Sequence, residues 1–157
     1  MLSRSCLFAA GLVLGGCSSQ PDPAPVTGHG GPCDNSSAVI DSYAAGIVKT
    51  SADGKIRVKV TDALPAPPAR HSNKWTILFT DGTNKPLGGM VYVQPFMPDH
   101  GHGTTPPEVG MIDAQGAVVV DKLDFVMPGV WEVRFSDGPV PAAAKDHRAV
   151  FAFCIDG

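Results

Sequence analysis

The sequence predicts an all-β protein, folded as an antiparallel β-sandwich of seven to eight strands. Three observations predict it. Short runs alternate apolar and polar residues with a period of two, turn residues separate the runs at fairly regular intervals, and the 3.6-residue period of helices is nearly absent. The connections are rich in proline, as in LPAPPARHSNK at 64–74, and proline interrupts both helices and central strands.

The clearest strand is KIRVKVTD at 55–62, where apolar residues alternate with basic ones, as expected for a strand with one buried face. At 89–96, we expect Met90, Tyr92 and Gln94 on one face and the residues between them on the other. The runs predicted as strands are 43–51, 55–62, 74–81, 89–96, 108–112, 117–125, 130–136 and 148–155.

The first residues predict a secretory signal, because a short basic start precedes an apolar run too short to span a bilayer. Residues Leu14-Gly15-Gly16-Cys17 resemble the lipobox of bacterial lipoproteins. The resemblance implies a signal peptide at 1–16 and acylation of Cys17, whereas an ordinary signal peptide is the alternative. We therefore expect a lipid-anchored protein of the cell envelope that faces the periplasm. Ser18 favours the outer membrane over the inner one.

Residues 17–32 predict a flexible tether, since proline, glycine and serine dominate them and apolar residues are scarce. His29 lies in this tether and is expected to face solvent. Residues 33–157 follow as one domain of about 125 residues, which is long enough to bury a core.

The cysteines predict one disulfide. Cys6 leaves with the signal peptide and Cys17 carries the lipid, so Cys33 and Cys154 remain in an oxidising compartment. Closing a loop of this length stabilises the fold by about 4–5 kcal/mol. The alternative is that both thiols bind a soft metal. Their distance in the sequence from each other and from the histidines disfavours it.

Composition excludes several functions. The formal net charge is −3 and no basic cluster occurs, so we expect no nucleic-acid partner. Familiar catalytic motifs, including a nucleophile elbow, a P-loop and a zinc-protease helix, are absent. The two glutamates, Glu108 and Glu132, form no close pair with an aspartate. The sequence therefore predicts a protein that is not an enzyme.

The segment FMPDHGHGT at 96–104 concentrates metal-binding side chains. His100 and His102 are two residues apart and project to the same side of an extended backbone, while Gly101 lets the chain bend until both rings reach one ion. Met97 lies just upstream, where the following proline favours extended geometry. Asp99 is either a further ligand or a hydrogen-bond partner that orients a histidine.

The segment FVMPGVW adds a second thioether, Met127, whose spacing from Leu123 and Phe125 fits a core position equally well. Thioether sulfur binds Cu(I) well and offers little to Zn²⁺ or Ca²⁺. Met90 and Met111 are also candidate soft donors, although we expect both in the core. The remaining histidines, His71 and His147, are expected at the surface.

The string VYVQPFMPDHGHG and the later LDFVMPGVWEVRF resemble the YtkA-like/FixH-like family of small exported bacterial proteins over residues 43–154. The resemblance implies an immunoglobulin-like β-sandwich and a role in copper handling, with delivery of copper to cytochrome oxidase as one outcome. It places Met97, His100 and His102 on the first motif and Met127 on the second. Family members often read MPxMGHG, so here His100 replaces a second sulfur.

The resulting hypothesis is a copper chaperone or carrier that binds one ion through Met97, His100, His102 and Met127. Cu(I) is the favoured state and Cu(II) the alternative. The acceptor would be a protein such as a cytochrome oxidase subunit or assembly factor. Two rival interpretations stay open: an envelope interaction module whose histidines are incidental, and a small copper or zinc enzyme.

Overall fold

The computed structural model describes residues 30–105, 110–139 and 144–157. The predicted signal peptide, Cys17, His29 and Glu108 lie outside these ranges. The elements are β1 (Val48–Thr50), β2 (Arg57–Leu64), β3 (His71–Thr80), β4 (Met90–Met97), β5 (His102–Gly103), β6 (Gly110–Met111), β7 (Ala117–Phe125), β8 (Gly129–Ser136), the 3-10 helix η1 (Lys145–His147) and β9 (Ala149–Ile155).

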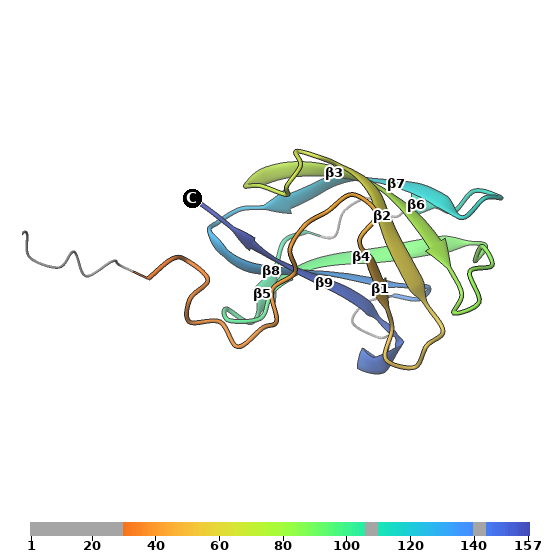
Figure 1. Ribbon diagram of the computed structural model, residues 1–157, viewed down its shortest axis with the longest axis horizontal. Coiled ribbons are helices and arrows are strands. Elements are labelled where there is room, and N and C mark those ends of the chain that lie inside the picture. The colour runs from red at the N-terminus through yellow and green to blue at the C-terminus, as the bar shows by residue number, and fades with distance from the viewer. Residues whose placement is uncertain (1–29, 106–109, 140–143) are drawn as a thin grey trace, which may run out of the picture.

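Two antiparallel sheets pack face to face (Figure 1). One sheet has the order β1-β2-β3-β7, and the other has the order β5-β4-β8-β9 with β6 also paired to β4. Among the longer strands, β2, β3 and β7 thus form one sheet and β4, β8 and β9 form the other, which is the strand arrangement of immunoglobulin-like domains. The predicted all-β sandwich is confirmed.

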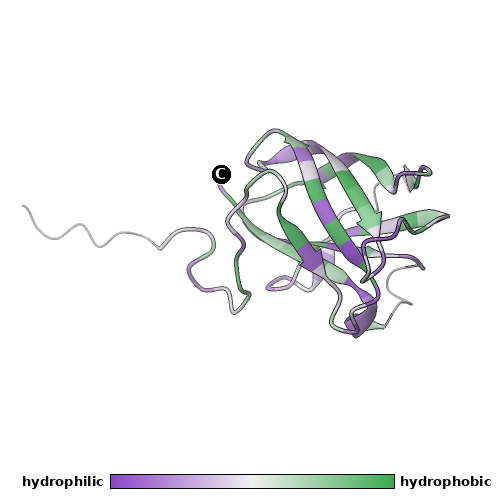
Figure 2. Ribbon diagram, turned by 45° about the vertical axis from the view of Figure 1, so that its right-hand side comes forward, coloured by the Kyte–Doolittle hydropathy of each residue, from purple (hydrophilic) through white to green (hydrophobic). Residues whose placement is uncertain are grey.

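The core forms mainly because β2, β3, β4 and β7 bury alternate side chains and β8 and β9 bury most of theirs, and the hydropathy along several strands alternates accordingly (Figure 2). Trp75 of β3 lies at the centre of this core and is fully buried. Its ring centroid lies 6.3 Å from that of Phe135, 6.2 Å from that of Phe151 and 5.7 Å from that of Phe153. Because these three phenylalanines belong to β8 and β9, Trp75 joins one sheet to the other.

The strand predictions need two corrections. The segment predicted at 43–51 contains only β1, since Ile47 N donates to Ala44 O in a turn and Gly46 adopts a φ of +88°. The described residues also contain β5, a two-residue strand, so they hold nine strands instead of seven to eight. Strands this short carry no periodic signal, which is why the sequence pattern does not reveal β5.

The predicted disulfide is confirmed. Cys33 and Cys154 are bonded across 121 residues, with their Cα atoms 5.8 Å apart. Cys154 lies on β9, the outer strand of its sheet, and the chain after Cys33 follows this strand. There Asp41 N donates to Ala152 O at 2.7 Å, and Ala152 N donates to the Asp41 carboxylate at 2.9 Å. The N-terminal segment thereby covers an edge that would otherwise expose unpaired backbone groups.

In the part of the chain that the structure describes, no helix is long and apolar enough to cross a membrane.

Replacing Trp75 tests its role in joining the sheets. Trp75→Ala should lower the free energy of unfolding by about 3–5 kcal/mol, because it leaves a large cavity between them. Val119→Thr on the half-exposed face of β7 is the control and should change it by less than about 0.5 kcal/mol. Chemical denaturation measures both, and equal effects of the two substitutions would contradict this account of the core.

Candidate metal site

The site begins with a tight hairpin between β4 and β5. Met97 is the last residue of β4 and pairs directly with His102, the first of β5. In the turn between them, the Met97 carbonyl accepts hydrogen bonds from His100 N at 3.3 Å and Gly101 N at 2.9 Å. Gly101 has a φ of +69°, a conformation that glycine adopts without steric cost. The turn therefore returns the chain so that His100 and His102 meet.

The two imidazoles are exposed neighbours. The centroids of the His100 and His102 rings are 5.6 Å apart, and their planes cross at 67°. A metal–nitrogen bond of about 2.0 Å places the ion about 3.1 Å from a ring centre, so two rings on one ion have centres about 5–6 Å apart. The observed separation falls in this range. The spacing of the two rings therefore allows one ion between them.

Met97 points into the sandwich and is only 1% exposed. Its terminal methyl occupies the space beside Gly129, where a Cβ atom would lie 2.7 Å from Met97 Cε. Phe96, its neighbour, points to the other face of the sheet, where the Arg134 guanidinium lies 3.7 Å from the Phe96 ring centroid. The period of two along β4 thus directs the sulfur of Met97 inward, beneath the hairpin.

An open pocket of about 270 Å³ connects the buried methionine with the exposed turn. Its walls comprise three side chains of the hairpin region, the first two residues of β8 and part of the N-terminal segment. The lining residues are Pro32, Asn35, Ser36, Met97, Asp99, His100, Gly129 and Val130. The structure therefore brings Met97, Asp99 and His100 together in one pocket, and the ring contact places His102 beside them.

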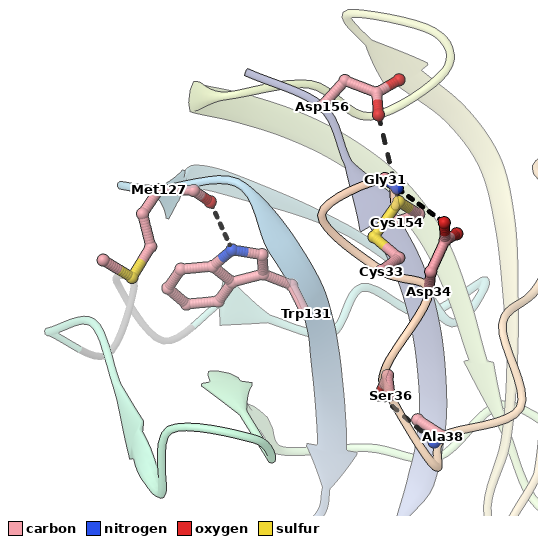
Figure 3. The surroundings of a disulfide bond; sticks show 9 residues. All are labelled: Gly31, Cys33, Asp34, Ser36, Ala38, Met127, Trp131, Cys154 and Asp156. Carbon is pink, nitrogen blue, oxygen red and sulfur yellow. Dashed lines mark hydrogen bonds between the residues drawn. A yellow bond between two sulfur atoms is a disulfide. The ribbon is translucent and has the colours of Figure 1, made fainter. Parts of the chain in front are cut away.

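Of the four predicted ligands, His102 does not line this pocket, and neither does Met127. It lies on the connection between β7 and β8, half-buried against the core. Its carbonyl accepts a hydrogen bond of 2.9 Å from Trp131 Nε1, which fixes the backbone just before β8 (Figure 3). This packing agrees with the alternative expectation that Met127 occupies a core position.

The expectation that Met90 and Met111 are core residues is wrong. Met90 is 41% exposed and Met111 is 68% exposed. They face each other across β4 and β6 on the outer surface of the sheet. The faces of β4 were predicted correctly, with Val91 and Val93 buried, but an apolar side chain at a strand end does not reveal whether its face is covered.

His147 was expected at the surface and instead is half-buried between two carboxylates. Its Nδ1 lies 2.6 Å from Asp53 Oδ2, and its Nε2 lies 2.9 Å from Asp137 Oδ1. These partners are 94 and 10 residues away in the sequence, so no local motif predicts them. Both ring nitrogens are engaged, which makes this cluster a clamp between the β1–β2 turn, the end of β8 and η1. His71 is exposed, as expected.

Within the described ranges, no three or more histidine, cysteine, aspartate or glutamate side chains are arranged to hold a metal ion. The candidate site therefore depends on thioether sulfur as well as imidazole nitrogen. Such a mixed set suits a copper ion better than a hard cation.

No family model matches this chain, and neither a curated protein nor a solved structure matches it. The resemblance to the YtkA-like/FixH-like family is thus carried by the two methionine-proline motifs alone.

The His147 clamp predicts a pH-dependent stability. Hydrogen bonding to Asp53 first, and then to Asp137, raises the pKa of His147. Hydrogen bonds from Ser51 first, and then from His147, lower the pKa of Asp53. A raised histidine pKa stabilises the fold fully below about 6.5, the pKa of an unfolded histidine, and this stability is lost as the pH rises through the folded value. The unfolding free energy should therefore decline above neutral pH.

His147→Gln should abolish this decline, since glutamine keeps polar contacts but does not titrate. The control is His71→Asn at an exposed position with a φ of +68°, which asparagine tolerates, and it should retain the decline. Urea denaturation at a series of pH values measures the effect. If the unfolding free energy of His147→Gln declined with pH as steeply as that of the wild type, His147 would not be the group that causes the decline.

Proposed function

We propose that this protein binds one copper ion at the β4–β5 hairpin and acts as a copper carrier. The observation that carries the proposal is the pair of exposed imidazoles, with ring centroids 5.6 Å apart, beside a pocket that Met97 lines. His100 and His102 supply the nitrogens, and Met97 supplies the first sulfur. Met127 is the second sulfur that the family resemblance implies.

The donor types favour Cu(I). Two neutral imidazoles and a thioether add no negative charge to the ion, and a thioether binds without losing a proton. Cu(II), the alternative, would gain more from the carboxylate of Asp99, which lines the same pocket. If Asp99 does not ligate, its place beside His100 suits a hydrogen bond that orients the ring.

The exposure of the histidines suits transfer rather than catalysis. An acceptor protein can approach the hairpin and replace His102 and His100 one at a time, without unfolding the core. The buried Met97 would then release the ion last. Ligand exchange of this kind needs no acid or base, so the proposal is a carrier and not an enzyme.

The proposed location is the cell envelope, with the chain anchored to a membrane through lipidated Cys17 and facing the periplasm. The support is the lipobox-like sequence at residues 14–17. The copper acceptor that the family resemblance suggests is a cytochrome oxidase subunit or an assembly factor of that enzyme.

Removing the imidazoles tests the proposal. In His100→Ala/His102→Ala, the Cu(I) affinity should fall more than about 100-fold, because loss of ligands exceeds the 10- to 100-fold cost of losing their hydrogen-bond partners. Competition against a coloured Cu(I) chelator measures it under anaerobic conditions. His71→Asn and His147→Gln are matched histidine controls and should bind like the wild type.

Two outcomes would overturn the proposal. One is a Cu(I) affinity in the double variant equal to that of the wild type. The other is a clear preference for Zn²⁺ over Cu(I) in the same competition, which would favour a zinc site.

A further inference from the structure

The N-terminal segment forms one wall of the candidate metal pocket. Pro32, Asn35 and Ser36 line the same pocket as Met97 and His100, although more than half of the described chain separates them in sequence. The Pro32 carbonyl oxygen also lies close to the start of β8, 3.9 Å from the position that a Cβ of Gly129 would take. Residues 32–36, here called the wall segment, therefore form one side of the pocket.

The disulfide holds this wall segment in place. Cys33 lies inside it and is bonded to Cys154 of β9. The two cysteines pack with Val130 and Ala152 in a small apolar cluster, and Val130 itself lines the pocket. Figure 3 shows the loop with Cys33 and Asp34 beside β9, with Cys154 at the contact. One layer of side chains thus connects the disulfide with the pocket.

Few other interactions of the described residues hold the wall segment. Its internal turns, Asp34 N to Gly31 O at 3.1 Å and Ser36 N to Cys33 O at 3.2 Å, shape the loop but do not attach it to the sheets. Further along the chain, Ala38 packs against the apolar cluster of Cys33, Val130 and Ala152, and the next hydrogen-bonded attachment is that of Asp41 to Ala152. Without the disulfide, mainly this apolar packing would attach the wall segment to β9 before Asp41, so the segment could move away from β9 more easily.

We infer that the Cys33–Cys154 disulfide is a positioning element of the pocket: when it is intact it holds the wall segment beside Met97 and restricts access to it, and its reduction widens the route to the Met97 sulfur. For its effect on metal retention, this inference rests on the proposed function. The accessibility of Met97 does not depend on that function.

The redox step is a thiol–disulfide exchange with a dithiol of the envelope as reductant. The Cys33–Cys154 bond breaks and accepts two electrons, the dithiol becomes a disulfide, and its two protons end on the thiols of Cys33 and Cys154. An ion bound at Met97 would then leave faster, because the wall segment no longer covers it.

Peroxide oxidation of methionine, followed residue by residue by peptide mass spectrometry, tests the inference without any metal. In the wild type, Met97 should oxidise at least about ten-fold more slowly than exposed Met111. In Cys33→Ser/Cys154→Ser, Met97 should react at least about five-fold faster, while Met111 keeps its rate. Met127, which is half-buried outside the pocket lining, is a second internal control and should also keep its rate.

Because loss of the disulfide costs about 4–5 kcal/mol, a second variant keeps the test decisive if the serine variant unfolds. Asn35→Gly/Ser36→Gly retains the disulfide and removes two side chains of the wall. It should also accelerate Met97 oxidation, whereas Ser37→Gly, whose side chain does not line the pocket, should not. An unchanged Met97 rate in the folded serine variant, or in Asn35→Gly/Ser36→Gly, would overturn the inference.

Silver(I), a stand-in for Cu(I) that does not change oxidation state, tests the consequence for metal retention. The serine variant should release Ag(I) to a competing chelator at least about five-fold faster than the wild type. Equal release rates would overturn this part. If wild-type binding of Ag(I) is independent of His100 and His102, the proposed function fails, and the oxidation experiment still decides whether the disulfide closes the pocket.

Discussion

The contact of Trp75 with three phenylalanines of the opposite sheet is the interaction on which the site depends. It holds the two sheets together around the core, and the pairing of β4 with β8 within one sheet brings the end of β4 to the start of β8. At that point Met97 points inward because β4 alternates strictly, and Gly129 leaves the space that the methionine fills. The hairpin then has to turn above a buried sulfur. A site with an inner thioether and outer imidazoles follows from this arrangement.

The sequence predicts the sandwich well because its signal is local. Alternation along β2, β4 and β7 and the turn residues between strands reflect one buried face, which each segment displays by itself. The disulfide was also predictable, since only two cysteines remain after the lipobox-like segment is set aside. By contrast, Met90 and Met111 were misplaced, because burial depends on what covers a sheet face and not on the strand that carries it.

The candidate site was predictable only in part. The residues of the hairpin are neighbours in the sequence, so the proximity of His100 and His102 could be anticipated from their spacing. The wall of the pocket could not, because Pro32 and Ser36 reach it only through the path of the N-terminal segment along β9. The cysteines are far from the histidines in the sequence, and we therefore expected them to be far apart in space as well. In the fold, however, the segment around Cys33 lies next to His100. The partners of His147 were hidden for the same reason.

The central claim is that two imidazoles and the thioether of Met97 share one copper ion. X-ray absorption at the copper edge of the Cu(I)-loaded protein tests it most directly. The account predicts nitrogen scatterers at about 2.0 Å and sulfur at about 2.3 Å. It also predicts a weaker sulfur contribution in Met97→Leu, a substitution of similar volume. A spectrum without sulfur, or one that Met97→Leu leaves unchanged, would contradict the account.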